Sequence, residues 1–390
     1  LELRGVEAKR LVYLYIAQYA QEYFAEAIMS VNCFVRDARD KACPAVRAMA
    51  IRTMSCLRVK DLNEYLIAPI EEALTDSDPH VKRTAALAVA KINAVNPDLI
   101  AKSGALDALR GLLHSEENPL VFSSALLALE EVGRGSGQAP LVWDSALIEK
   151  ALNCLPECSE WAQISLIDLL GQAQITALAD REKVVERLLA RLSHINCGVV
   201  LASAKAILAL GETLGAEVLA ELVRKLSTPL STLANAQADT AWAVLRNLHV
   251  LAARHPALFS APRMFFAKAA DPPFVKLEKI ALVEKVTAAD SFRESVAELA
   301  QCAFDSSRDV SSASLRAIGT IAVGVEESVE ACLLALQGLL AVGLENAFAD
   351  NFLNECVVSL ARIARRYPQR AEVGPVFELV QGQFARLSHT

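Results

Sequence analysis

The residues of this sequence best suited to chemistry are two cysteines spaced four apart, Cys154 and Cys158. On a helix they would share one face, and His194 and Cys197 follow further along the chain. Thiolates and imidazoles are ligands that zinc prefers. A structural zinc site normally has a second closely spaced ligand pair, and no second CxxC pair occurs. We therefore predict no metal ion at these residues.

A glycine-rich stretch at residues 133–137 (GRGSG) invites comparison with a phosphate-binding loop. Such a loop follows a β-strand and ends in Gly-Lys-Ser/Thr, and this stretch has neither feature. We predict a surface loop at 133–140. The chain also lacks a His-Glu-x-x-His motif, a nucleophile elbow and paired carboxylates in a glycine-marked pocket. We predict a protein that is not an enzyme and binds no cofactor.

The chain contains a repeated helical pattern in place of catalytic motifs. An apolar stripe recurs with the offsets 0, 4, 7, 8 and 11, which is one face of an α-helix. Its first residues are Val46, Val81, Val121, Val200 and Val310. The second position is always small, so two helices can approach closely. Asp, Asn or Ser with proline precedes several stripes, as at Asp78-Pro79 and Asn118-Pro119, and Asp309 precedes another.

One amphipathic helix per roughly 35–40 residues, with a second helix between stripes, is typical of HEAT or armadillo arrays. We predict an all-α, right-handed α-solenoid that runs continuously over residues 1–390 in about nine or ten helix pairs. Two charged residues, Lys279 and His249, fall at places where the stripe expects burial.

Composition limits the function classes. The net charge is −7, which argues against nucleic acid as a partner. The nine scattered cysteines and the absence of any Asn-x-Ser/Thr site favour the reducing cytosol. The longest uncharged run, residues 331–344, is shorter than a bilayer span requires. The chain begins at Leu1 without a signal peptide, so we expect a fragment of a longer protein.

Eight stretches, in family order, resemble the trunk of a beta-adaptin, the large beta subunit of a clathrin adaptor complex. They are residues 9–15 (KRLVYLY), 27–32 (AIMSVN), 46–59 (VRAMAIRTMSCLRV), 76–92 (DSDPHVKRTAALAVAKI), 160–164 (EWAQI), 191–208 (RLSHINCGVVLASAKAIL), 275–279 (VKLEK) and 316–319 (RAIG). The segment 52–59 resembles the Golgi and plasma-membrane types most closely.

The resemblance implies a cytoplasmic scaffold, peripheral on Golgi, endosomal or plasma membranes, in a heterotetramer with a medium subunit, a second large adaptin and a small subunit. It implies that clathrin binds only through the hinge and ear, which this chain does not include. It also implies that Ile28 and Val31 match a docking face for a small Arf-type GTPase. Packing of both side chains in the core is the alternative.

A basic segment at residues 36–60 carries seven cations against two carboxylates. We interpret its members and a second group near the C-terminus as contacts for anionic lipid headgroups or phosphoinositides, with a solvated, ion-paired face as the alternative. The candidate lipid contacts are Arg36, Arg39, Lys41, Arg58, Lys60, Arg365 and Arg366.

Two further residue patterns are expected to be structural. Trp161 is predicted to pack in the core. Residues 166–170 (LIDLL) superficially resemble a clathrin box, but Leu166, Leu169 and Leu170 belong to the stripe and are expected to be buried.

Two other solenoid classes remain open as alternatives. A nuclear transport receptor would need acidic residues on its concave helices, whereas the stripes here are often flanked by basic residues such as Arg47 and Lys82. A phosphatase scaffold would have no lipid or GTPase contact.

Overall fold

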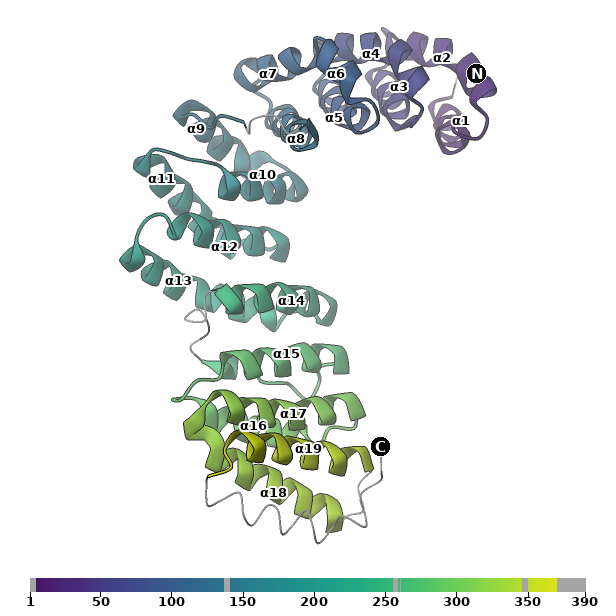
Figure 1. The fold of residues 1–390 in the computed structure, drawn as a ribbon. Helices are drawn as coiled ribbons and strands as arrows, with labels where there is room; N and C mark the ends of the chain where they lie inside the picture. Colours follow the sequence, from purple (N-terminus) through teal and green to yellow (C-terminus); the bar gives the residue numbers. More distant parts are fainter. Residues whose placement is uncertain (1–4, 137–140, 255–258, 260, 346–349, 370–390) are drawn as a thin grey trace. The chain divides into compact units, whose positions relative to one another are not determined.

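The computed structural model of the protein describes residues 5–136, 141–254, 259, 261–345 and 350–369, without the side chains of residues 60–63, 136 and 350. Within these residues there are nineteen α-helices, four short 3-10 helices and no strand (Figure 1). The predicted all-α fold of stacked helix pairs is therefore confirmed. The helices form two compact units, Leu1–Gly215 and Ala216–Thr390, which are described separately.

In the first unit the helices alternate between two layers, and the stripe helices stack on one another (Figure 1). Thus α3 packs on α5, α5 on α8, and α10 on α12. The elements are α1 (Val6–Tyr19), α2 (Phe24–Ala38), α3 (Pro44–Cys56), α4 (Lys60–Leu74), α5 (Pro79–Val95), α6 (Pro97–Lys102), α7 (Ala105–Ser115), α8 (Pro119–Ser136), α9 (Ser145–Cys154), η1 (Leu155–Glu157), α10 (Glu160–Gln172), α11 (Leu178–Leu189), η2 (Ala190–Ser193) and α12 (Cys197–Gly211).

The second unit repeats this arrangement. Helices α14, α15, α17 and α19 stack in sequence order, while α13, α16 and α18 pack against them from the other layer. The elements are α13 (Ala216–Ala234), α14 (Ala238–Arg254), η4 (Pro262–Phe265), α15 (Pro273–Val286), α16 (Phe292–Cys302), α17 (Arg308–Gly324), η5 (Glu326–Ser328), α18 (Val329–Glu345) and α19 (Asp350–Arg366).

At most stripe helices the predicted capping side chain or proline stands at the start of the helix. The Asp78 carboxylate accepts hydrogen bonds from the backbone N–H groups of His80 (2.9 Å) and Val81 (3.3 Å), and Pro79 occupies the first turn. One start differs from the prediction, because α17 begins at Arg308 and Asp309 lies inside its first turn. A carboxylate there still faces the positive end of the helix dipole.

The stripe forms the core. All five small residues at its second position are fully buried, namely Ala50, Ala85, Ala125, Ala204 and Ser314. Small residues outside these positions also allow a close approach, since a Cβ on Gly171 of α10 would lie 2.8 Å from the Cβ of Ala206 on α12. Such contacts leave little room for larger residues, which explains the low aromatic content of the chain.

The predicted loop at 133–140 is wrong in its first half. Helix α8 continues through Gly133 to Ser136, and residues 137–140 lie outside the described residues. An ion pair between Glu130 and Arg134 (3.3 Å), four residues apart, supports this last turn.

The two ionisable residues that interrupt the stripe, Lys279 and His249, have different surroundings. Lys279 is 1% exposed, and its ammonium group bonds the carboxylate of Asp271 (2.7 Å) and the side-chain oxygen of Asn235 (3.3 Å). His249 lies with its Nε2 atom 2.9 Å from the carboxylate of Glu278, but neither of its buried ring nitrogens makes a hydrogen bond among the described residues. Burial and the nearby Lys285 lower the pKa of His249, which favours its neutral form.

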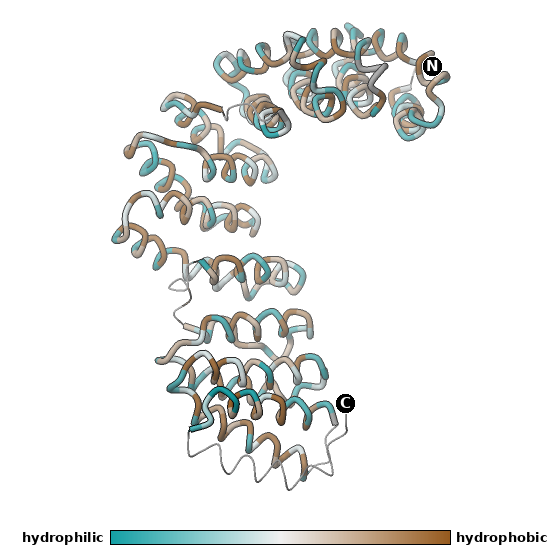
Figure 2. The backbone as a smooth tube through the Cα atoms, viewed as in Figure 1, coloured by the Kyte–Doolittle hydropathy of each residue, from teal (hydrophilic) through white to brown (hydrophobic). Residues whose placement is uncertain are grey.

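One helical stretch, Glu326–Glu345, is long and apolar enough to cross a bilayer by length and composition, and 44% of it is buried in the structure. Figure 2 shows its apolar character along α18. Its buried positions, such as Val329, Leu336 and Leu340, lie where α18 packs on α16, α17 and α19.

Candidate functional site

The cations of the basic segment differ in how deeply they and their acidic partners are buried. The Arg47 guanidinium binds both carboxylate oxygens of Asp76 (2.8 and 2.9 Å) and the backbone oxygen of Asp40 (2.8 Å), and the Arg47 and Asp76 side chains are only 12% and 14% exposed. Burial works against ionisation of Asp76, but the hydrogen bonds from Arg47 and from the Asp78 N–H hold its pKa below the usual value. Arg47 therefore joins two repeats and is not available to a partner.

Arg39 makes the same bidentate contact with a carboxylate, but at the solvent-exposed surface. Its guanidinium bonds both carboxylate oxygens of Glu72 (2.7 and 2.5 Å), but the two side chains are 54% and 55% exposed. The hydrogen bonds from Arg39 lower the pKa of Glu72. Exposed pairs of this kind contribute little to stability. Arg39 can thus exchange its partner for another anion at low cost.

The remaining cations of the basic segment whose side chains the structure describes lie at the surface. Arg36 is exposed beside the buried Asp37, with 3.8 Å between its Nε and the Asp37 carboxylate. Lys41, Arg52 and Arg58 are also exposed. Lys60 falls outside the described side chains, so its predicted role has no structural counterpart here. The exposure of Arg36, Lys41 and Arg58 meets the first requirement of a lipid-binding face.

Asp37 is a structural acid. It accepts hydrogen bonds from the Lys9 ammonium (2.7 Å) and from the Tyr13 hydroxyl, which is itself 2% exposed. Burial and the hydrogen bond to Asp37 raise the pKa of Tyr13. Tyr13 also packs edge-on against Phe34, with 4.7 Å between the ring centroids. This network holds α1 on α2 and so positions the helix that carries Ile28 and Val31.

The structure separates the two residues matched to a GTPase contact. Ile28 is 41% exposed, and its neighbour Met29 is 80% exposed. Val31 is 7% exposed, because it points into the interface of α2 with its neighbouring helices. Ile28 and Val31 thus do not form one apolar pair on the surface. A partner that docks on this part of α2 would contact Ile28 and Met29 directly.

Arg365 and Arg366 lie in the last turn of α19, in the second unit, and both are exposed. The Arg366 guanidinium sits over the ring of Tyr367, 5.9 Å from its centroid. The Tyr367 hydroxyl in turn donates to the backbone oxygen of Val323 (3.2 Å). Cations at a helix C-terminus are favoured by the helix dipole, so they also have a local structural reason to be there.

The structure contradicts the prediction that Trp161 packs in the core. The side chain is 82% exposed, because Trp161 lies at the second residue of α10 and points away from the stripe. By contrast, Leu166, Leu169 and Leu170 are buried as predicted, so the clathrin-box resemblance is not accessible. Helical periodicity alone did not reveal that Trp161 is exposed. A residue at the end of a helix has no preceding turn to cover it.

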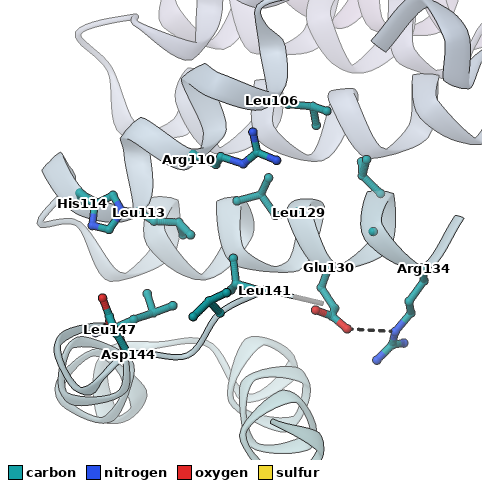
Figure 3. Close-up of a pocket in the computed structure, with 13 residues that line it drawn as sticks. Leu106, Arg110, Leu113, His114, Leu129, Glu130, Arg134, Leu141, Asp144 and Leu147 are labelled. Carbon is teal, nitrogen blue, oxygen red and sulfur yellow. Dashed lines mark hydrogen bonds and ion pairs between the residues drawn. The ribbon is translucent and has the colours of Figure 1, made fainter. Parts of the chain in front are cut away.

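A cavity of about 550 Å³ opens between α7, α8 and the segment leading into α9 (Figure 3). Five leucines line it together with the cations Arg110 and Arg134 and the anions Glu130 and Asp144. One of these leucines is Leu129, a stripe residue that the sequence places in the core. It is half-buried, and one part of its surface lines the cavity.

The other chemical candidates find no support in the described residues. Gly133–Ser136 form the C-terminal turn of a helix, whose carbonyl groups repel a phosphate. Cys154 and Cys158 are buried, and burial raises the pKa of both thiols. Among the described side chains no group of three or more His, Cys, Asp or Glu residues is placed to hold a metal ion.

Comparison with known proteins gives consistent matches. A protein-family model, the adaptin N terminal region, matches residues 2–383. AP-1 complex subunit beta-1 of Rattus norvegicus is 35% identical over 376 residues, which cover 95% of this chain and 39% of that protein. AP-2 complex subunit beta of Schizosaccharomyces pombe is 28% identical over 371 residues, which cover 94% of this chain and 54% of that protein. The chain thus spans about two-fifths to one-half of these relatives.

The fold has a structural counterpart as well. A homology model of the full-length AP-3 complex in an intermediate open conformation contains a chain that superposes with a TM-score of 0.58 and 17% identity. The superposition covers 94% of this chain and 63% of that chain. At this identity the likeness shows a shared fold.

Proposed function

Because the chain belongs to the adaptin N-terminal region family, we propose that it acts as the trunk of a beta-type adaptor subunit. Its role is a non-enzymatic scaffold for vesicle-mediated protein transport. The observation that carries the proposal is the family match over residues 2–383, together with relatives named as beta subunits of AP-1 and AP-2 complexes. The alternatives of a nuclear transport receptor or a phosphatase scaffold have no comparable support.

The structure suits a scaffold in two ways. Ion pairs between successive repeats, such as Arg47–Asp76, Lys82–Glu116 and Lys276–Asp305, fix the stacking of the helices. The stripe helices then present a series of parallel surfaces on which a partner can lie. We propose that the chain works with a medium subunit, a second large adaptin and a small subunit, on the cytoplasmic side of Golgi, endosomal or plasma membranes.

Co-expression with the N-terminal domain of a medium subunit from the same source tests this role. A stoichiometric complex that co-elutes in size exclusion, and that increases the soluble yield of the chain, is the expected result. Elution of the chain as a separate monomer would refute the assignment. Small-angle scattering of the same complex would test the prediction that residues 1–390 form one continuous solenoid, since a hinged chain gives a broader distance distribution.

We further propose that Arg36, Arg39, Lys41 and Arg58 contact anionic lipid headgroups, with Lys60, Arg365 and Arg366 as additional contacts. The exposure of the first four, and the exchangeable partner of Arg39, support the proposal. Each basic residue near an anionic surface contributes about 1 kcal/mol. Reversing Arg36, Lys41 and Arg58 to Glu should therefore reduce co-sedimentation with phosphoinositide-containing vesicles by at least tenfold.

A matched control uses three exposed cations elsewhere in the first unit, Lys183, Arg187 and Lys205, reversed in the same way. The control changes the net charge equally. An equal loss of vesicle binding in both variants would mean that only the net charge matters and that the basic segment is not a binding face.

A further inference from the structure

Three large apolar side chains are exposed at the edge where successive stripe helices begin. Leu120 lies at the start of α8 and is 36% exposed, Trp161 lies at the start of α10 and is 82% exposed, and Ile195 precedes α12 and is 100% exposed. We call these three residues the apolar strip. Most exposed apolar residues occur singly, and a row of three in consecutive repeats needs an explanation.

Contacts between the repeats show that the three residues follow one another along this edge. The Asn196 side chain, next to Ile195, donates a hydrogen bond to the carboxylate of Glu160, next to Trp161 (2.6 Å). Similarly, the Cys158 thiol donates to the backbone oxygen of Pro119, next to Leu120 (3.7 Å). These bonds join α8 to α10 and α10 to α12 at the ends from which the strip projects.

Packing within the unit does not require these residues. Leu120 and Trp161 occupy the position just before the stripe, where Ala45 and His80 stand in the two preceding repeats. The helix beneath Trp161 is anchored by other contacts, since the buried Gln163 donates to the backbone oxygen of Cys158 (2.9 Å). A tryptophan that no neighbour covers is instead the residue type most enriched in binding hot spots.

The charges around the apolar strip select the partner. Three exposed carboxylates flank it, namely Glu117, Glu157 and Glu160. The nearby cations Lys82, Lys150 and Arg191 are all half-buried, and Lys82 and Lys150 already bond the Glu116 carboxylate and the backbone oxygen of Leu113. A net negative rim repels an anionic membrane and attracts lysine and arginine side chains.

We propose that the apolar strip is a docking site for a segment of a partner protein that carries apolar side chains flanked by lysine or arginine. Helices in contact are 8–10 Å apart, so three repeats present anchors over about 20 Å. That length matches about 13 residues of a helix at 1.5 Å per residue. The apolar residues of the segment would cover Trp161 and its neighbours, and its cations would face the rim. The proposal does not depend on the adaptor role.

Selection from a library of random 16-residue displayed peptides tests it. Peptides are selected on the full chain and then compared on Trp161→Ala and on Trp242→Ala, a control that removes another exposed tryptophan in the second unit. We expect the selected peptides to combine apolar residues with Lys or Arg. We expect Trp161→Ala to weaken their binding at least tenfold in fluorescence anisotropy, and Trp242→Ala to leave it unchanged. Circular dichroism verifies that both variants are folded.

Two further sets of measurements test the role of the negative rim and the possibility that a membrane or a second copy of the chain occupies the apolar strip. Glu117→Gln with Glu157→Gln should weaken binding and reduce its salt dependence. The proposal is overturned if no peptide distinguishes Trp161→Ala from the control, or if the selected peptides are acidic or uncharged. It is also overturned if phosphatidylserine vesicles bind in a Trp161-dependent way, or if sedimentation shows that the chain itself dimerises through Trp161.

Discussion

The two bidentate arginine pairs, Arg47–Asp76 and Arg39–Glu72, make a matched test of what burial adds to an ion pair. Both place two guanidinium nitrogens on two carboxylate oxygens at 2.5–2.9 Å, and both join residues about one repeat apart. The side chains differ mainly in exposure, 12% and 14% against 54% and 55%.

We expect double-mutant cycles on the two pairs to give very different coupling energies. Exposed pairs contribute little to stability because solvent screens them, so the Arg39–Glu72 coupling should be close to zero. Removing one partner of a buried pair typically costs about 3–5 kcal/mol. Asp76 retains the hydrogen bond from the Asp78 N–H (2.8 Å) and some exposure. Arg47→Ala should therefore destabilise the chain by about 2–3 kcal/mol, slightly less than is typical when one partner of a buried ion pair is removed.

The assay is urea unfolding of the single and double variants, followed by circular dichroism at pH 7 and repeated at pH 3. Since the folded-state pKa of Asp76 is depressed, its contribution is present above the unfolded pKa of about 4 and is lost as the pH falls through the folded value. The coupling of the buried pair should therefore shrink at pH 3. Equal coupling in both pairs, or a coupling that grows at low pH, would refute the reasoning.

Four further single substitutions, one of them followed by a second change, have definite expected outcomes. From the family resemblance we propose that an Arf-type GTPase docks at Ile28, so Ile28→Asp should abolish binding of such a GTPase loaded with a GTP analogue without changing the thermal melt. Val31→Asp instead buries a charge and should unfold the first helices, and a stable Val31→Asp chain would contradict the burial of Val31. Lys279→Met should cost about 3 kcal/mol in urea unfolding, and adding Asp271→Asn should recover part of it, because a lone buried charge is worse than none. Gly171→Val should cost about 1–3 kcal/mol, since α12 lies directly against this position, and an unchanged melting temperature would mean that the helices can separate freely.

The apolar stripe determines most of the fold. A face that repeats with the period of the helix has to be buried, so residues such as Val81 and Ala85 could be assigned to the core from their spacing alone. Proline and capping side chains likewise fixed where α3, α5 and α8 begin. Family membership also followed from sequence, because the matching stretches lie in order along the chain.

The partners of the charged residues could not be read from the sequence. Arg39 lies next to Asp40 in the sequence and Arg47 has no acid within six residues, yet their partners lie 33 and 29 residues away. Stacking of the repeats brings these residues together, and no local pattern distinguishes the pair that becomes buried from the one that stays exposed. The same holds for Ile28 and Val31, which are three residues apart on one helix but differ in what lies opposite them.

The sequence by itself thus determined the repeat, its helices and the family, because local periodicity and capping are properties of contiguous residues. Only the tertiary structure decided which helix ends remain uncovered. Trp161 was assigned to the core by its residue type, and it is exposed because the adjoining repeats do not extend over the start of α10. Exposure at a helix end depends on the packing of neighbouring repeats, and that packing is set by residues far along the chain.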